Sequence, residues 1–312
     1  MQINKNNKIF VAGHKGMVGT AVVKYLKKKN YTNIITIDKK KLNLLNQKQT
    51  EKYLKNVKPD CVIIAAARVG GIIANNKYKA NFIYENLMIQ TNLIHSSYLA
   101  GVKKLIFLGS SCIYPKFSKQ PINEDQLLSG KLEETNDAYA IAKIAGIKMC
   151  EAYNKQYNLN YLCLMPTNLY GPNDNYNLLT SHFYPALIKK IHDAKINNKK
   201  YLSIWGNGKS KRELMYVDDL ADACEFFLRK KTKHTLINIG SGIEKTIEGF
   251  AKFLMKKFQI KLKIKKDFSK PNGTPRKILN SKIAKNYGWK SKIDLGTGLN
   301  LTYKDFLEKN KT

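Results

Sequence analysis

The alternation of short apolar runs with helix-forming segments is the feature of this 312-residue chain that most constrains its fold. Runs such as KIFVAG (8–13), DCVIIAAA (60–67) and KKLIFLGSS (103–111) predict buried strands, and the segments between them space apolar residues as a helix does. Strands separated by helices require crossover connections, which are right-handed in nearly all folds. The sequence therefore predicts an α/β fold with a doubly wound, parallel Rossmann-type sheet.

The rhythm of strands and helices changes after Gly171, where a loop-rich stretch begins. We predict a nucleotide-binding Rossmann domain over residues 1–171, to which a segment at about 214–242 returns. Residues 172–213 and 243–312 are predicted to form a smaller, mixed α/β substrate-binding lobe.

The composition is strongly basic, with 55 Lys and Arg against 23 Asp and Glu and a formal charge of +32. A polyanionic partner such as nucleic acid is one explanation, and compositional drift toward lysine is the other. The lysines are scattered, without a compact arginine-rich or aromatic-interleaved patch, so we favour drift and predict no nucleic-acid partner. A positive field would still attract a phosphorylated nucleotide substrate.

Targeting signals are not apparent in the sequence. No apolar run approaches the roughly 20 residues of a membrane helix, and the N-terminus leads into a strand without the apolar region of a signal peptide. The five cysteines show no CxxC pair, and their odd number fits reduced thiols. We expect a cytoplasmic protein with no membrane partner and no metal site.

The glycine motif GHKGMVG lies between the first predicted strand and the first predicted helix. In that position it predicts a dinucleotide site, because the pyrophosphate can approach the free N–H groups of the helix N-terminus. The predicted cofactor contacts are Gly13, His14, Lys15, Gly16, Met17, Val18 and Gly19. Near the end of the second strand, Asp38 favours NAD, whereas the cations Lys39, Lys40 and Lys41 favour the 2′-phosphate of NADP. On charge, NADP(H) is the predicted cofactor.

Tyr139 and Lys143 in YAIAK are four residues apart, so both lie on one face of a helix predicted over 138–157. A nearby ammonium lowers the pKa of a tyrosine from about 10. The tyrosine can then give a proton to a carbonyl oxygen as a hydride reaches the carbon. Ser110, after the preceding strand, could hydrogen-bond the same oxygen. The pattern predicts carbonyl reduction, although YxxxK also occurs by chance with only a structural role.

A wider set of motifs resembles one family. In order along the chain these are GHKGMVG, AARVGGI, NFIYENLMIQTN, FLGSSCIYPK, YAIAKIAGIKMCE, MPTNLYGPND, SHFYPALI and KPNGTPRK. Together they resemble the GDP-L-fucose synthases, which are bifunctional 3,5-epimerase/4-reductases of the extended short-chain dehydrogenase superfamily. The resemblance covers nearly the whole chain, and GSSCIYP and the SH before YPALI are its most specific parts.

The resemblance implies NADPH-dependent conversion of GDP-4-keto-6-deoxy-D-mannose to GDP-L-fucose. It assigns Cys112 as the base and His182 as the acid of the C3 and C5 inversions. It assigns the C4 reduction to Ser110, Tyr139 and Lys143. A thiol and an imidazole suit this work because both can be tuned to titrate near neutrality. Read in isolation, the same residues would be a strand-end cysteine and a surface histidine.

Further contacts are implied by the same resemblance. The cofactor residues are Lys39, Leu108, Gly109, Lys143, Pro166, Thr167, Asn168, Leu169 and His182, and the substrate residues are Lys190, Trp205, Arg212 and Asn272. Trp205 could instead be a core-edge aromatic. Two positions depart from the family: Lys39 replaces a frequent arginine, and Asn272 replaces a common aspartate. Lysine lacks the bidentate fork of arginine, which weakens the expected preference for NADP.

The helices predicted at residues 81–100 and 139–157 carry many apolar side chains. By resemblance, two such helices per subunit would pair across a two-fold axis in a four-helix homodimer interface; packing within one domain is the alternative.

Two rival functions remain open. One is a related enzyme that acts on a GDP-4-keto-heptose or only reduces C4, and the other is a non-catalytic dinucleotide sensor or nucleic-acid-binding protein.

Overall fold

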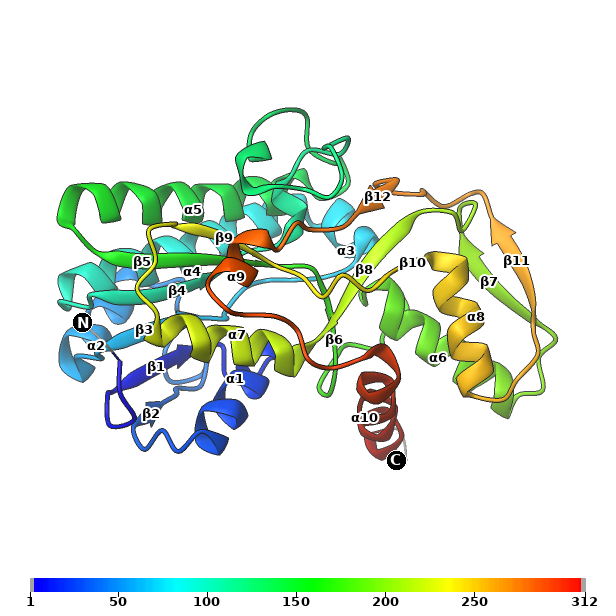
Figure 1. Cartoon of the computed structure of the whole chain (residues 1–312), viewed down its shortest axis with the longest axis horizontal. Helices are drawn as coiled ribbons and strands as arrows, with labels where there is room; N and C mark the ends of the chain where they lie inside the picture. Colours follow the sequence, from blue (N-terminus) through cyan, green and yellow to red (C-terminus); the bar gives the residue numbers. More distant parts are fainter. Residues whose placement is uncertain (1–2, 310–312) are drawn as a thin grey trace.

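The computed structural model of the chain describes residues 3–309 and is built around a six-stranded sheet (Figure 1). In the spatial order β2–β1–β3–β4–β5–β9 the strands are Ile34–Ile35, Ile9–Ala12, Cys61–Ile64, Lys104–Leu108, Asn160–Pro166 and Leu236–Ile239. All neighbouring strands run parallel. The predicted doubly wound, Rossmann-type α/β fold is therefore confirmed.

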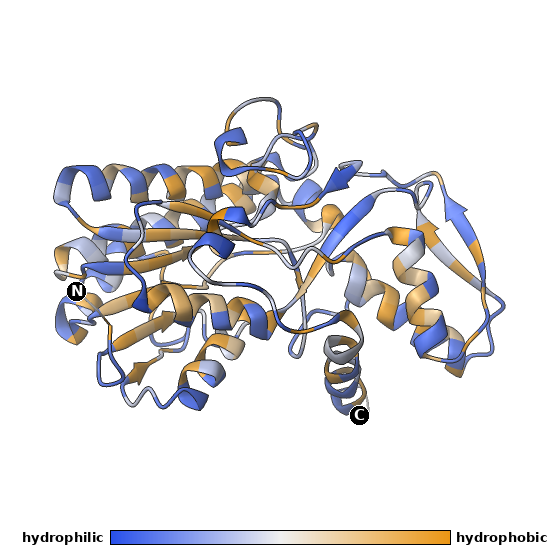
Figure 2. Ribbon diagram, in the orientation of Figure 1, coloured by the Kyte–Doolittle hydropathy of each residue, from blue (hydrophilic) through white to orange (hydrophobic). Residues whose placement is uncertain are grey.

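Helices cover both faces of this sheet (Figure 1). The helices are α1 (Met17–Lys28) and α7 (Val217–Arg229) on one face, and α2 (Gln47–Val57), α4 (Lys79–Leu99) and α5 (Asp137–Tyr157) on the other. Alternation along β1 sends Ile9 and Val11 to the first face and Phe10 to the second. Because both faces are covered, the central strands are mainly apolar, as Figure 2 shows.

A second lobe has its own sheets and apolar cluster. In it β8 (Lys211–Tyr216) pairs with β6 (Asn168–Tyr170), β10 (Glu244–Thr246) and β12 (Arg276–Lys277), while β7 (Tyr201–Trp205) pairs with β11 (Lys263–Asp267). The helices α6 (Phe183–Ile196), α8 (Ile247–Lys257) and α10 (Leu295–Lys309) pack on these strands. The chain crosses between lobes where β5 ends at Pro166 and β6 begins. The predicted domain limits stay a prediction.

The remaining elements are short. They are α3 (Ile72–Lys77), the 3₁₀ turns η1 (Ser111–Ile113) and η2 (Glu124–Gln126), and α9 (Lys282–Asn286). Within residues 3–309, no helix combines the length and the apolar character that crossing a membrane requires.

The order of the central strands decides where a ligand can bind. The chain winds outward from β1 to β2 and then in the opposite direction from β3 to β9, so the switch point lies between β1 and β3. In open α/β sheets, ligands bind outside the carboxyl ends of the strands at such a point. The loops after β1, β3, β4 and β5 meet there, and α3 lies between this edge and β8 (Figure 1).

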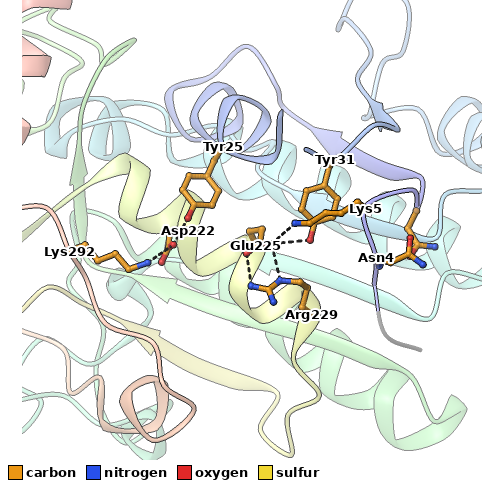
Figure 3. A network of polar contacts seen from close by, with 9 residues as sticks. Asn4, Lys5, Tyr25, Tyr31, Asp222, Glu225, Arg229 and Lys292 are labelled. Atoms are coloured by element: carbon orange, nitrogen blue, oxygen red, sulfur yellow. Dashed lines mark hydrogen bonds and ion pairs between the residues drawn. The ribbon is translucent and has the colours of Figure 1, made fainter. Parts of the chain in front are cut away.

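Two buried carboxylates of α7 hold α1 and the C-terminal segment against the sheet (Figure 3). Asp222 accepts hydrogen bonds from the Tyr25 hydroxyl, from Trp289 Nε1 at 2.8 Å and from Lys292 Nζ at 2.7 Å. Burial raises the pKa of Asp222, but these donors outweigh it and leave the pKa below its usual value. The ionised carboxylate therefore stabilises the fold fully above the ordinary Asp pKa of about 4. This stability is lost as the pH falls through the lowered pKa.

Glu225 forms the second half of the network (Figure 3). It accepts from the Tyr31 hydroxyl at 3.0 Å, from Arg229 Nε at 2.8 Å and from Lys5 Nζ at 3.2 Å. With only 3% of its surface exposed, Glu225 depends on these donors for its charge. The N-terminal segment is thereby tied to α7, far from the predicted cofactor edge.

We expect Asp222→Ala to lower the free energy of unfolding by about 2 kcal/mol, because the indole N–H of Trp289, 2% exposed, loses its acceptor. Urea denaturation followed by tryptophan fluorescence measures the change. The control is Asp193→Ala, which removes a more exposed pair with Lys189 on one helix and should change stability by about 0.5 kcal/mol or less. Equal losses in the two variants would show that the network adds nothing beyond a surface ion pair.

Candidate active site

The loop between β1 and α1 has the close packing that a dinucleotide needs. Gly13 has a φ of +86°, and a Cβ there would lie 2.5 Å from the backbone nitrogen of Ala66. A Cβ on Gly19 would lie 2.1 Å from the carbonyl oxygen of Gly13, so helix and strand approach as closely as glycine permits. Helix α1 begins at Met17, which Val18 follows. Gly16 provides no side-chain cap, and the first turn holds no acidic residue. Its N-terminus is therefore suited to a pyrophosphate.

The end of β2 carries the choice between NAD and NADP. Asp38 forms an ion pair with Lys15 Nζ at 2.6 Å and lies 3.6 Å from His14 Nε2. The hydrogen bond from Lys15 lowers the pKa of Asp38 below its usual value. Lys39 and Lys40 are exposed beside it. The single carboxylate is thus already paired with the glycine loop, and the surrounding cations remain for a phosphate.

The predicted reduction residues meet after β4. Lys143, only 3% exposed, donates from Nζ to the carbonyl oxygen of Leu108 at 2.9 Å. Its ammonium lies 5.9 Å from the ring centroid of Tyr139, and burial lowers the pKa of Lys143 to about 8. Ser110 caps η1 by accepting the backbone N–H of Cys112 at 3.3 Å. Strand end and helix α5 therefore bring the three predicted residues to one cleft.

The pKa of Tyr139 moves in the direction opposite to our expectation. Burial raises it far above the usual range, the Cys112 charge raises it further, and only Ser110 opposes the shift. The reason is that Lys143 donates to the Leu108 carbonyl and that only 9% of Tyr139 is exposed. The tyrosine is therefore protonated at neutral pH, which is the state a proton donor requires.

The Cys112 thiol lies beside cations. Lys277 Nζ is 3.4 Å from Cys112 Sγ, and Arg212 adds a second positive charge. Burial on its own would raise the pKa of Cys112, but Lys277, the Ser110 hydroxyl and Arg212 together lower it below its usual value. The other four cysteines are buried. Only Cys112 therefore has the setting of a reactive thiol.

His182 precedes α6 as its N-cap residue and is exposed to solvent. Desolvation and the positive charge of Lys277 lower the pKa of His182, and the same charge helps to lower the pKa of Cys112, so one lysine acts on both residues. Backbone contacts fix the turn before it, since Gly71 N–H donates to the Thr180 carbonyl at 2.8 Å. A Cβ on Gly71 would lie 2.2 Å from the Ser181 carbonyl oxygen, so the two loops are tightly packed.

The residues predicted beside the nicotinamide form the crossing between lobes. Thr167 Oγ1 and Asn168 Nδ2 donate to the carbonyl oxygen of Glu213 at 3.2 and 2.9 Å. Pro166 ends β5 and Leu169 lies in β6. A Cβ on Gly109, after β4, would lie 2.2 Å from Met165 Cε, so the strand ends are close together. These positions line the carboxyl edge of the sheet next to Leu108.

The predicted substrate residues lie in the second lobe. Lys190 donates from Nζ to the Ser203 carbonyl at 3.1 Å and lies 5.9 Å from the Trp205 ring. Trp205 lines a cleft of about 310 Å³ with Ile72 and Ile73 of α3, Asn76, Lys77, Thr135, Ser269, Lys270 and Pro271. Arg212 NH1 donates to the Thr274 carbonyl at 2.6 Å. Of the predicted substrate residues, Trp205 therefore lines this cleft together with the cations Lys77 and Lys270, whereas Lys190 and Arg212 are not among its lining residues.

Asn272 is engaged within its own lobe. Its Oδ1 accepts the backbone N–H of Asn207 at 2.8 Å, and its carbonyl accepts from Ser210 Oγ at 3.0 Å. An aspartate oxygen could accept the same N–H, so the replacement keeps this turn contact. Within residues 3–309, no group of His, Cys, Asp and Glu side chains is arranged to hold a metal ion.

Sequence reasoning missed two residues of the cleft. Lys277 is the last residue of KPNGTPRK, a motif from which only Asn272 was taken as a candidate. Glu213 is fully buried beside Arg212 on β8. The signal for Lys277 was its position at the end of a motif, and the signal for Glu213 was a lone acid directly before the apolar run LMYV.

Comparisons with known proteins place these observations in a family context. A family model described as the NAD dependent epimerase/dehydratase family matches residues 9–240. The chain is 50% identical over 306 residues to the putative GDP-L-fucose synthase 2 of Arabidopsis thaliana, with 98% of this chain and 93% of that protein covered. It is 49% identical over 307 residues to the GDP-L-fucose synthase of Sinorhizobium fredii, with 98% of each covered.

A solved structure shows the same similarity in three dimensions. The GDP-mannoheptose C4 reductase from Campylobacter jejuni with NADP bound has a TM-score of 0.89 and 37% identity to this chain. The match covers 97% of this chain and 99% of that one, so it includes both lobes.

The ion pair between Asp38 and Lys15 predicts that changing either residue shifts the preference between NADPH and NADH, in opposite directions. Asp38→Asn removes the carboxylate that would repel a 2′-phosphate, so we expect NADPH to bind about fivefold more tightly and NADH more weakly. Lys15→Ala should do the opposite. Dissociation constants from quenching of protein fluorescence measure both effects. Lys24→Ala, exposed on α1, is the control and should change neither constant. Equal changes for both cofactors would contradict a role in discrimination.

Proposed function

Because the chain belongs to the GDP-L-fucose synthases of the NAD dependent epimerase/dehydratase family, we propose that it converts GDP-4-keto-6-deoxy-D-mannose to GDP-L-fucose with NADPH. The observation that most supports this reaction is the cation-paired thiol of Cys112, two residues from Ser110 in the cleft that also holds Tyr139 and Lys143. A plain reductase has no use for such a thiol. An enzyme that also inverts two carbons needs a base beside its reducing residues.

The inversions would use Cys112 and His182. The 4-ketone acidifies the protons on C3 and C5, so the thiolate of Cys112 can remove one while an acid returns a proton on the opposite face. In the free protein the pKa of His182 is lowered, which favours the neutral imidazole. The negative charge of a bound diphosphate would favour the imidazolium again. Substrate binding would thereby prepare His182 to donate.

Reduction of C4 would follow. NADPH, when bound, supplies the hydride. Tyr139, kept protonated by burial, donates its phenolic proton to the C4 oxygen, and the Ser110 hydroxyl hydrogen-bonds the same oxygen. Lys143, with a pKa of about 8, is largely charged at neutral pH, and its ammonium would have to turn from the Leu108 carbonyl to stabilise the phenolate that remains. The tight backbone packing at Gly13 and Gly19 would orient the cofactor against the carboxyl edge of the central sheet.

A related GDP-sugar is the second candidate substrate. The similarity to a GDP-mannoheptose C4 reductase supports a heptose, or a reduction without inversion. The higher identity to GDP-L-fucose synthases and the presence of Cys112 with His182 favour the 6-deoxyhexose and the bifunctional reaction. We further propose that the protein acts in the cytoplasm.

We also propose a homodimer formed through α4 and α5. These two helices lie side by side along one edge of the molecule (Figure 1). Apolar side chains on them remain exposed, with 58% of Tyr84, 47% of Ile141 and 38% of Leu99 accessible. Exposed apolar side chains on two helices that pack together fit a subunit interface.

Turnover in D₂O tests the bifunctional reaction. With GDP-4-keto-6-deoxy-D-mannose and NADPH, the product read by NMR should be GDP-L-fucose with solvent deuterium at both C3 and C5. A reduced product without deuterium at these carbons would make the protein a 4-reductase. Absence of turnover, followed by turnover of a GDP-4-keto-heptose, would establish the second candidate.

Two variants separate the two half-reactions. Tyr139→Phe should slow NADPH oxidation by about 10²- to 10⁴-fold, because its proton donor is missing, while deuterium exchange at C3 and C5 continues. Cys112→Ser should lose the exchange and keep cofactor binding. Tyr157→Phe, at the far end of the same helix, is the control for removing a phenol from α5. A Cys112→Ser variant that makes wild-type product would refute the role of the thiol.

Light scattering with size-exclusion chromatography tests the dimer. The wild type should have twice the 35.6 kDa mass of one chain, and Tyr84→Glu should shift it to the monomer by burying a charge in the interface. Phe268→Glu changes a still more exposed aromatic of the second lobe and should leave the dimer intact. A wild-type monomer would refute the proposed interface.

A further inference from the structure

Lys277 is held in the cleft from both sides of its strand. It pairs in parallel register with Arg212 of β8. The residues that follow are fixed as well, since Ile278 N–H donates to Gln120 Oε1 at 3.0 Å and Leu279 N–H donates to Glu213 Oε2 at 2.9 Å. The backbone that carries Lys277 therefore has little freedom to move.

The partner of the Lys277 ammonium is a thiol. The side chain is 9% exposed, and its Nζ lies 3.4 Å from Cys112 Sγ. The adjacent Arg276 pairs with both oxygens of Glu244, whereas Lys277 forms no ion pair with an Asp or Glu of the described chain. A buried ammonium without a counter-charge is strongly disfavoured. The Cys112 sulfur is the group at hand that can supply a negative charge.

We propose that Lys277 is a positioning residue that holds Cys112 as a thiolate before the substrate binds. The inference rests on the proposed function for the use of that thiolate as the base of the inversions, but the ion pair itself belongs to the free protein. The C3 or C5 proton moves to the sulfur and leaves its electron pair in the enolate of the 4-ketone. Return of a proton from His182 on the other face completes each inversion.

The groups around Cys112 favour the thiolate from several elements. Lys277 faces it from β12 and Arg212 from β8, and the Ser110 hydroxyl stabilises it from the start of η1. Tyr139 of α5 is protonated and adds no competing charge. The same ammonium also lowers the pKa of His182, but there it disfavours the charged form, which is the imidazolium. One lysine therefore biases both residues of the predicted acid–base pair.

Alkylation of the free protein by iodoacetamide, measured at each cysteine by mass spectrometry across pH, tests the proposal. In the wild type the Cys112 rate should titrate below the usual thiol pKa of about 8.5. Lys277→Met should raise the midpoint by one unit or more and slow alkylation at pH 7 by about tenfold. Lys277→Arg should restore most of the shift. Lys263→Met, on the exposed face of β11, should have no effect, and the four buried cysteines serve as internal controls.

Binding of NADPH and circular dichroism establish that each variant is folded. A Cys112 midpoint that does not move in a folded Lys277→Met would overturn the proposal, and a raised KM for the GDP-sugar in that variant would identify Lys277 as a substrate contact instead. A shifted midpoint in a protein that epimerises no GDP-sugar would support the ion pair and refute the proposed function. The two hypotheses therefore fail separately.

Discussion

The buried carboxylate of Glu213 is the interaction on which the geometry of the cleft depends. From the middle of β8 it accepts the backbone N–H groups of Leu279 at 2.9 Å and Gly242 at 2.7 Å. Its own carbonyl receives Thr167 and Asn168 from the crossing between lobes. Burial raises its pKa, and the hydrogen bonds from the backbone oppose that shift. Through its side chain and its carbonyl, one residue thereby joins three segments that are distant in the sequence.

The cleft collects three cations that form no ion pair with an Asp or Glu among the described residues. Lys143 donates to a carbonyl, Arg212 donates to carbonyls, and Lys277 lies against a thiol. Such a site is costly when empty and becomes favourable when anions enter it, because a dinucleotide and a GDP-sugar both bring diphosphates. The overall charge of +32 acts in the same direction at long range. Charge on this surface therefore serves small anionic ligands without requiring a nucleic acid.

The sequence was most informative where function follows a local pattern. Gly13 and Gly19 are read from spacing because a Cβ at either position would clash with backbone. Tyr139 and Lys143 share a helix face because residues four apart are neighbours on a helix surface. Lys277 could not be found this way, because 165 residues separate it from Cys112 and only the pairing of β12 with β8 joins them. The direction of the Tyr139 pKa was also missed, since burial cannot be read from the four-residue spacing.

The opposite pKa shifts of Cys112 and Tyr139 would allow one cleft to carry out the two proposed half-reactions. The thiol and the phenol share Ser110 as a neighbour, yet cations surround the sulfur while apolar packing against Phe82 surrounds the phenol. At one pH the first group is poised to accept a proton and the second to donate one. Had both groups shifted in the same direction, either the inversions would lack a base or the reduction would lack an acid. The proposed chemistry thus requires the two pKa values to be separated, and the separation arises from the cations beside the sulfur and the apolar packing around the phenol.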